Sequence, residues 1–405
     1  MLNKFALLCA ASTAFVSAPA LAQAGPYEIG ENTTLDPIIE GTLRYESVSQ
    51  PDTAADDADA LTFRIRSGAE FKTGGLFLLA EAEATLAIID DYNDTIPGNG
   101  VEPYSVVADP DNIELNRLAI GYSAKGTTVT LGRQAINLDD QRFVGAVAWR
   151  QNEQTFDAAR VQTKIGPVSL DGTYSFSQRT IFGVDSPNEH FDGNIYLVNG
   201  GFDLSSVKVK AFAYLIDYDT RLAYSSQTYG VRAAGAVPLG GSTKLNYVLS
   251  YAKQSDYGDN PIDYSADYIG AEAGLGFGAF GIKGGYELLG SDDGVAAFQT
   301  PLATLHKFNG FADLFLSTPA NGLQDYYGGA SYKIGDMGPL KGLAAGVTYH
   351  KFESDEGGMN YGDEIDATLA FKVGKVGLLA KYANYNAKEW ATDTEKFWFQ
   401  ASFSY

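Results

Sequence analysis

Apolar and polar side chains alternate along most of this chain with a period of two residues. Residues 61–72 are the clearest case, because Leu61 and Phe63 fall on one face and Arg64 and Arg66 on the other. This period is that of a β-strand with one apolar and one polar face. A soluble β-sandwich alternates in the same way, so one such strand does not identify a membrane protein.

The number of strands and their connections separate the two classes. The alternating segments are residues 37–48, 61–72, 75–89, 112–124, 127–137, 154–165, 167–180, 190–203, 206–219, 225–237, 242–256, 263–276, 279–290, 325–336, 341–353, 361–373, 375–387 and 393–405. Eighteen is an even number, and each segment reaches the roughly 9–11 residues that a tilted strand needs to cross a bilayer.

Short and long connections follow each other in turn. Tight turns such as Thr73-Gly74 alternate with long polar segments such as 138–153 and 291–324. Short periplasmic turns and long external loops are typical of outer-membrane barrels, whereas a sandwich has no reason to alternate so regularly. The sequence therefore predicts an all-β fold: a transmembrane antiparallel β-barrel of about 18 strands. The last strand, with Phe403 and a terminal Tyr405, resembles the C-terminal signature that outer-membrane assembly recognises, although an ordinary apolar edge strand is the alternative.

Residues 1–22 have the pattern of a cleavable signal peptide. Lys4 provides the positive start, an apolar stretch follows, and Ala20 and Ala22 form a small-x-small cleavage site. Neither this stretch nor any other reaches 18 apolar residues, so no helical membrane span is expected. Cys9, the one cysteine, lies within the signal, which excludes disulfides and thiol chemistry from the mature chain.

The remaining residues, 23–405, form one predicted barrel domain. The formal charge of −21 becomes −22 when the single lysine of the signal is removed, so nucleic acid is not expected as a partner. Acidic loop clusters lack the spacing of a calcium loop, and we interpret them as solvated external loops or as divalent bridges to lipopolysaccharide. Three scattered histidines without a base–nucleophile motif argue against the enzyme alternative, a barrel hydrolase. An adhesin is a third class, disfavoured because the chain lacks repeats. No cofactor or metal is expected.

Two blocks carry a family resemblance. Residues 131–158 contain Gly-Arg-Gln, then Arg-Phe…Trp-Arg-Gln-Asn-Glu-Gln, then Thr-Phe-Asp-Ala; residues 300–319 read TPLATLHKFNGFADLFLSTP. Both resemble the alginate-export family of bacterial outer-membrane proteins. The resemblance implies an 18-stranded, monomeric barrel in outer-membrane lipid that passes an anionic uronate polysaccharide through an arginine-rich, loop-gated lumen. The family also contains members without an assigned substrate, so a channel is implied more firmly than alginate.

Charges that face the water-filled interior set the selectivity of a pore. The alternation places several cations inward, because charge facing lipid near the midplane costs about 2–4 kcal/mol per residue. The expected pore-lining arginines are Arg44, Arg64, Arg66, Arg117, Arg133, Arg160 and Arg232. The expected gating residues, from the family-like loop, are Arg142, Trp149 and Arg150.

Carboxylates such as Glu81 and Glu83 share the inward faces, which leaves two functions open. One is a channel for passive passage of an anionic solute, with a uronate polysaccharide or oligosaccharide as the sharpest candidate, since arginine pairs carboxylates bidentately. The alternative is a general or small-solute porin with a mixed-charge lumen. Genomic neighbours would best distinguish export from import.

Overall fold

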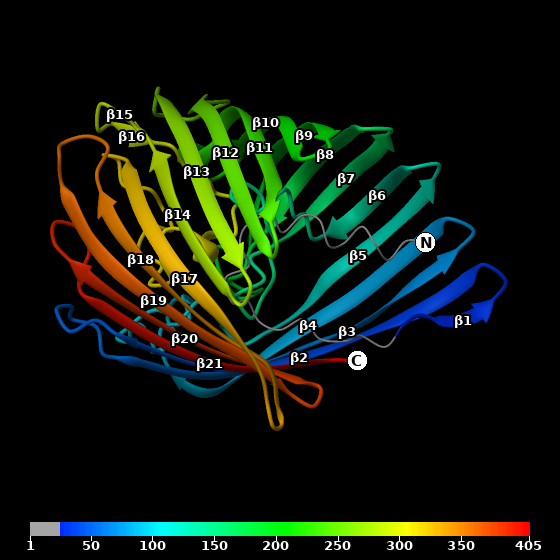
Figure 1. Ribbon diagram of the computed structural model, residues 1–405, viewed down its shortest axis with the longest axis horizontal. Helices are drawn as coiled ribbons and strands as arrows, with labels where there is room; N and C mark the ends of the chain where they lie inside the picture. Colours follow the sequence, from blue (N-terminus) through cyan, green and yellow to red (C-terminus); the bar gives the residue numbers. More distant parts are fainter. Residues whose placement is uncertain (1–24) are drawn as a thin grey trace.

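The computed structural model describes residues 25–405, which form a closed antiparallel β-barrel (Figure 1). Each of the eighteen predicted segments overlaps one wall strand, so the predicted fold class is confirmed. The wall strands are β2 (Thr33–Ser49), β3 (Ala58–Thr73), β4 (Leu76–Asp91), β5 (Asn112–Ala124), β6 (Thr127–Gln134), β7 (Thr155–Ile165), β8 (Val168–Arg179), β9 (His190–Leu204), β10 (Val207–Tyr218), β11 (Ser226–Gly240), β12 (Thr243–Asp256), β13 (Ser265–Phe277), β14 (Phe280–Leu289), β17 (Leu323–Met337), β18 (Leu340–Glu353), β19 (Asn360–Val373), β20 (Val376–Ala387) and β21 (Thr394–Ser404).

The barrel closes where β2 pairs with both β3 and β21. In the last pairing Gly41 lies opposite Phe403 and Tyr45 opposite Phe399, so the C-terminal strand completes the wall. A closed sheet has no free edge, which lets every strand satisfy its backbone groups inside a bilayer. The predicted signal peptide, residues 1–22, lies outside the described residues.

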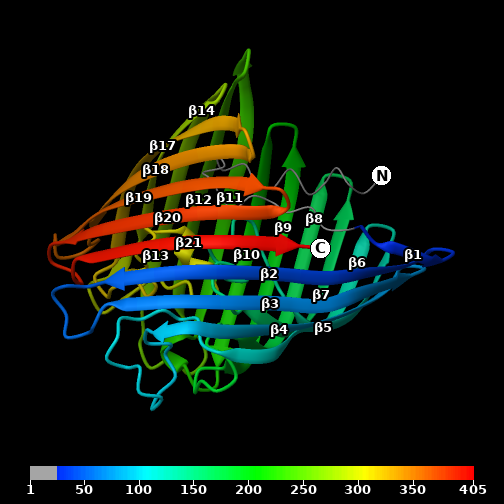
Figure 2. The same cartoon turned by 90° about the horizontal axis from the view of Figure 1, so that it is seen from below.

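The smaller elements are not among the wall strands. They are β1 (Tyr27–Gly30), β15 (Ser291–Asp292), β16 (Ala296–Ala297) and two 3-10 helices at Leu222–Tyr224 and Leu305–Lys307. The β1 strand pairs with the start of β2, at the end of the barrel opposite the long loops (Figure 2). Among the described residues, no helix is both long and apolar enough to cross a membrane.

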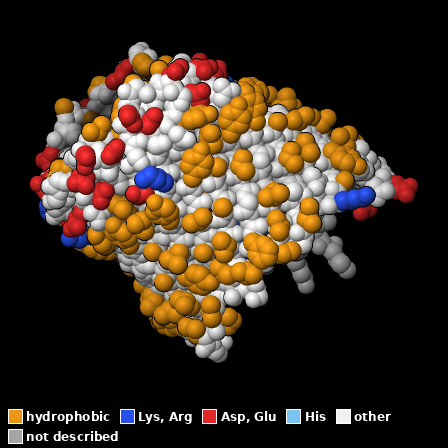
Figure 3. Space-filling model, turned by 90° about the horizontal axis from the view of Figure 1, so that it is seen from above, with side chains coloured by type: hydrophobic (Ala, Val, Ile, Leu, Met, Phe, Trp, Pro, Cys, Tyr) orange, Lys and Arg blue, Asp and Glu red, His pale blue; other side chains and the backbone are white. Residues whose placement is uncertain are grey.

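The two faces of the wall differ as the alternation predicts. Ile65 on β3 faces outward with 37% of its surface exposed, whereas its neighbours Arg64 and Arg66 face inward with 8% and 7% exposed. On the face that Figure 3 shows, apolar side chains are spread over the outer wall, and acidic side chains gather at the end that carries the long loops. The apolar face of the wall thus contacts lipid, and the polar face contacts the water-filled interior.

The chain leaves the wall after β6. This strand ends at Gln134, three residues before the predicted end at 137, because the chain turns into the barrel there. Ile136 is fully buried, and it belongs with Leu138 to an apolar cluster inside the lumen. The tertiary contact with that cluster therefore ends the strand earlier than the local pattern indicates.

Candidate functional site in the barrel lumen

Two long loops fold into the lumen and meet there. They are the β6–β7 loop (residues 135–154) and the β14–β17 loop (residues 290–322), which contain the two family-like blocks. Val144 and Leu302 form a β-bridge, and the Gly145 amide donates to the Leu302 carbonyl at 2.8 Å. A Cβ at Gly145 would lie 2.2 Å from the Thr304 hydroxyl, so this close approach requires glycine.

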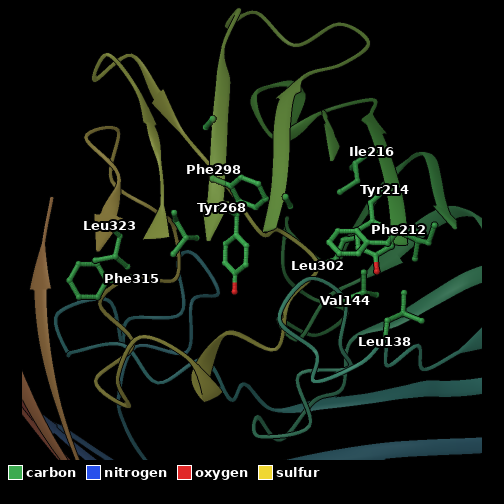
Figure 4. Close-up of a cluster of buried hydrophobic side chains, with 14 of the residues drawn as sticks. Leu138, Val144, Phe212, Tyr214, Ile216, Tyr268, Phe298, Leu302, Phe315 and Leu323 are labelled. Carbon is green, nitrogen blue, oxygen red and sulfur yellow. The ribbon is translucent and has the colours of Figure 1, made fainter. Parts of the chain in front are cut away.

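An apolar cluster holds the loops against the β9–β14 side of the wall (Figure 4). Phe143 of the β6–β7 loop lies 4.9 Å from the Phe212 ring and 5.0 Å from the Tyr268 ring. Phe298 of the β14–β17 loop is fully buried and 5.5 Å from Tyr268. Each large apolar side chain buried in this way contributes about 1.5–3 kcal/mol, which favours the docked position of the loops.

Charged contacts hold the same loops against the opposite side of the wall. Arg44 on β2 donates to Gln400 at 2.7 Å and lies over the Trp149 ring at 4.2 Å. Arg66 on β3 pairs with Glu83, and it lies 3.6 Å from Glu153 of the β6–β7 loop. The β6–β7 loop therefore crosses the lumen and is anchored at both ends.

Five of the seven arginines predicted to line the pore have a carboxylate partner on the inner wall or on a loop between wall strands. Besides Arg44 and Arg66, these are Arg117 with Glu81 at 2.5 Å, Arg160 with Asp171 at 2.5 Å and Arg232 with Asp140 at 2.9 Å. Arg64 faces inward and donates to Thr42 at 3.0 Å. The predicted inward direction of these six side chains agrees with the geometry, but the pairing cancels much of their charge.

The expectation that Arg133 lines the pore is wrong. Arg133 shares the face of Val129 and Leu131, whose side chains are exposed on the outer wall. Its guanidinium binds Asp157 through two hydrogen bonds of 2.8 Å and also donates to the Leu115 carbonyl. Since β6 ends one residue later, this bidentate pair covers the outer side of the wall where the chain turns inward.

The predicted gating arginines are buried between carboxylates. Arg142 donates to Glu287 at 2.6 Å, and it also reaches Thr300 and Asn309 of the β14–β17 loop. Arg150 lies 3.0 Å from Glu46 and 3.1 Å from Asp313. Burial opposes the charged form of Arg150, but Glu46 and Asp109 outweigh it and raise the pKa of the guanidinium.

Trp149 lies in an aromatic stack that the sequence did not predict. Its ring stacks on His306 at 4.5 Å with an interplanar angle of 6°, and Phe311 stacks on the other side of the imidazole at 5.3 Å. His306 contacts Asp313 through Nδ1 at 2.9 Å and the Lys381 ammonium through Nε2. Burial, assisted by Lys381, lowers the pKa of His306 to about 3. An ammonium only donates, so the neutral imidazole must accept at Nε2 and donate from Nδ1.

A cavity of about 580 Å³ remains between the loops and the wall. Its wall side carries small residues, among them Ser250, Gly270, Gly346 and Thr368, and its loop side carries Lys307. The cations that line it are Arg44, Arg142, Arg232, Lys283, Lys307 and Lys381; the carboxylates are Asp140, Glu272, Glu287, Asp325 and Asp366. Six cations to five carboxylates is a far more basic balance than that of the whole chain, which carries −21.

Sequence reasoning missed His306 and Lys307 of this site. Both lie within the block 300–319, so the family-like sequence was the available signal, and the loop's path into the lumen was not readable from it.

The comparisons agree with this geometry. Residues 42–293, more than half of the chain, match the sequence model of the family described as alginate export. The chain belongs to the alginate export family. The 131–158 block lies within the match, and the 300–319 block lies beyond its end. Among curated proteins no sequence matches the chain.

Solved structures of outer-membrane proteins share the fold of this family member. Pseudomonas aeruginosa OpdO is 16% identical, with a TM-score of 0.69 over 92% of this chain and 97% of that one. Acinetobacter baumannii OccAB4 is 12% identical, with a TM-score of 0.70 over 93% and 98%. The outer membrane protein OpdK of P. aeruginosa is 12% identical, with a TM-score of 0.69 over 91% and 98%. Together with the family match, this fold makes the protein a porin-like channel of the outer membrane.

Proposed function

We propose that this channel passes a small anionic solute, with a uronate oligosaccharide as the leading candidate. The observation that carries the proposal is the basic balance of the cavity, six cations to five carboxylates in a chain of charge −21. Low-dielectric walls focus the field of nearby charges, so the cavity attracts anions although distant loops are acidic. Those external carboxylates are screened beyond about 8–10 Å at physiological salt.

Two lysines of the cavity support an anionic solute further. Lys307 donates to the Asp140 carbonyl at 2.8 Å, and Lys381 contacts the His306 ring and lies 3.3 Å from the Phe311 ring centre. Within residues 25–405, neither ammonium has a carboxylate oxygen within 4.0 Å. A carboxylate-bearing solute would supply the missing partner.

The anchoring of the loops favours a small solute over a polymer. A thick polysaccharide needs a continuous wide tunnel, whereas the β6–β7 loop crosses the lumen between Arg66–Glu153 on one side and Phe143–Phe212 on the other. Moving it breaks buried contacts on both sides. An oligosaccharide fits a cavity of about 580 Å³, which is within the roughly 300–1,000 Å³ of common ligand pockets.

Passage is passive in this proposal, without catalysis or cofactor, and each barrel works as a monomer because it encloses its own lumen. The second candidate, a general porin with a mixed-charge lumen, is favoured by one observation: Arg117, Arg160 and Arg232 each pair with a carboxylate. Such pairs give a pore little preference for either sign of charge.

Reversal potentials in planar bilayers distinguish the two candidates. If the channel prefers anions, the reversal potential across a salt gradient has the sign expected for anion flow. Galacturonate or its dimer should then lower the current at millimolar concentration. Glucose and its dimer serve as neutral controls of the same size. A reversal potential at zero or of cationic sign, with equal effects of uronate and glucose, would establish the mixed-charge porin instead.

A further inference from the structure

The lumen is filled unevenly, and this asymmetry locates the solute path. On the β2–β5 side, the β6–β7 loop lies directly on the wall. Gln151 donates to Thr62 at 2.7 Å, and the Glu153 amide donates to Glu83 at 3.0 Å. Thr62 and Glu83 are 1% and 0% exposed, so water does not reach this sector at the level of the loop.

The buried sector contains two of the seven arginines that the sequence predicts to line the pore. Arg64 and Arg66 lie within it, together with Glu83 and Glu153. Arg66 and Glu83 form a pair that is neutral overall, and Arg64 donates to Thr42. Charges that are out of contact with water cannot meet a passing ion. Arg66 therefore helps to fix the position of the loop through Glu153, and neither arginine selects the solute.

The sector from β12 to β19 is built differently. Its inward positions at the cavity include Ser250 on β12, Gly270 on β13, Gly346 on β18 and Thr368 on β19. Gly346 and Thr368 lie opposite each other in the sheet, so two small residues adjoin at the same height. Small inward residues leave the space that large side chains and loops occupy on the other sectors.

Lys307 faces this open sector from the loop side. It ends the 3-10 helix Leu305–Lys307 of the β14–β17 loop, and it is exposed inside the lumen although its neighbours His306 and Asn309 are buried. Its ammonium also lies 5.1 Å from the Phe308 ring centre. An exposed cation at the boundary of the cavity is positioned to contact an anion that a buried arginine cannot reach.

We propose that solutes pass between the β14–β17 loop and the β12–β19 wall, and that Lys307 is the cation that determines their charge. The role of Lys307 rests on the anion channel proposed above, whereas the position of the path does not. The two parts therefore have separate tests.

Thiol block tests the position of the path. Thr368→Cys is placed in the cavity wall, and Thr62→Cys, the matched control, lies under the β6–β7 loop. The mature chain is expected to have no other thiol, since Cys9 lies in the predicted signal. A bulky neutral methanethiosulfonate reagent should lower the single-channel conductance of Thr368→Cys by roughly half or more, because it narrows the path. It should leave Thr62→Cys unchanged.

Block of Thr62→Cys without block of Thr368→Cys would overturn the path, whatever the ion selectivity of the channel. Heat-shifted gel mobility shows that each variant is folded, and Ser250→Cys provides a second position if Thr368→Cys does not fold. Equal block at both positions would also overturn the proposal, because the buried sector would then be open to solutes.

Charge removal tests the role of Lys307. Lys307→Gln should move the reversal potential toward cation preference and weaken block by galacturonate, whereas Arg64→Gln should change neither. If the wild type is anion-selective and Lys307→Gln has the same reversal potential and the same block by galacturonate, only the role of Lys307 is overturned. A wild type that prefers cations would overturn the proposed function, and thiol block would still decide the path.

Discussion

Arg150 is the residue whose loss should loosen the loops most specifically. Arg150 is 7% exposed, and its guanidinium joins Glu46 of the wall to Asp313 of the β14–β17 loop. In Arg150→Gln, Asp313 keeps its contact with His306, and Asp109 keeps Arg44 at 3.4 Å. Glu46 is 1% exposed, and within residues 25–405 it forms no second ion pair. The cost therefore falls mainly on Glu46.

The magnitude follows from that uncompensated charge. Removing one partner of a buried ion pair costs about 3–5 kcal/mol. The wall strands are paired on both sides whether or not the loops are docked, so this cost should appear in loop docking and not in unfolding of the barrel. At about 1.4 kcal/mol for each factor of ten, the undocked population rises roughly a hundredfold to a few thousandfold.

Single-channel recording and hydrogen exchange measure this change. Arg150→Gln should show frequent openings of larger conductance and faster amide exchange in residues 300–319. Arg160→Gln is the matched control, because it removes an equal lumen charge from a wall pair with Asp171 that touches neither inner loop. The double variant Glu46→Gln with Arg150→Gln should recover most of the wild-type behaviour. Arg150→Gln traces and exchange rates equal to those of wild type would refute the reasoning.

Three further predictions concern pH, topology and the buried arginines. His306 has a docked pKa of about 3 against an ordinary value near 6.5, so only the released imidazole gains a proton between these values. The free energy of loop docking should therefore weaken as pH falls below 6.5, by about 2 kcal/mol at pH 5, and the open probability of the channel should rise. His306→Asn should abolish this pH dependence in bilayer recordings. Cysteine at Asp57 should react with an impermeant thiol reagent on intact cells and cysteine at Ser205 should not, since long loops face outward; the reverse labelling would invert the topology. Arg66→Gln should lower barrel stability in urea by roughly 3–5 kcal/mol, because it leaves Glu83 without its partner, and should leave the reversal potential unchanged; a shifted potential at unchanged stability would contradict the buried placement.

The sequence alone determined the wall of this protein. The direction of side chains along a strand repeats every two residues. Arg64 and Arg66 could therefore be placed on the face opposite to that of Ile65 without knowledge of any distant contact. Long and short connections then gave the eighteen-stranded barrel, and the 131–158 block pointed to the family that the comparisons confirm. These features are local, or they repeat along the chain, and a pattern of neighbours can therefore reveal them.

The tertiary structure decided the lumen. Arg150 and Glu46 are 104 residues apart in sequence, and Arg142 and Glu287 are 145 residues apart, so no local pattern indicates that they pair. Arg133 faces outward because it shares the face of Val129 and Leu131, and β6 ends one residue later, at a point that contacts with a distant apolar cluster determine. Which cations meet water depends on where two loops cross a closed barrel, and that placement arises from packing across the lumen and not from the order of residues along a strand.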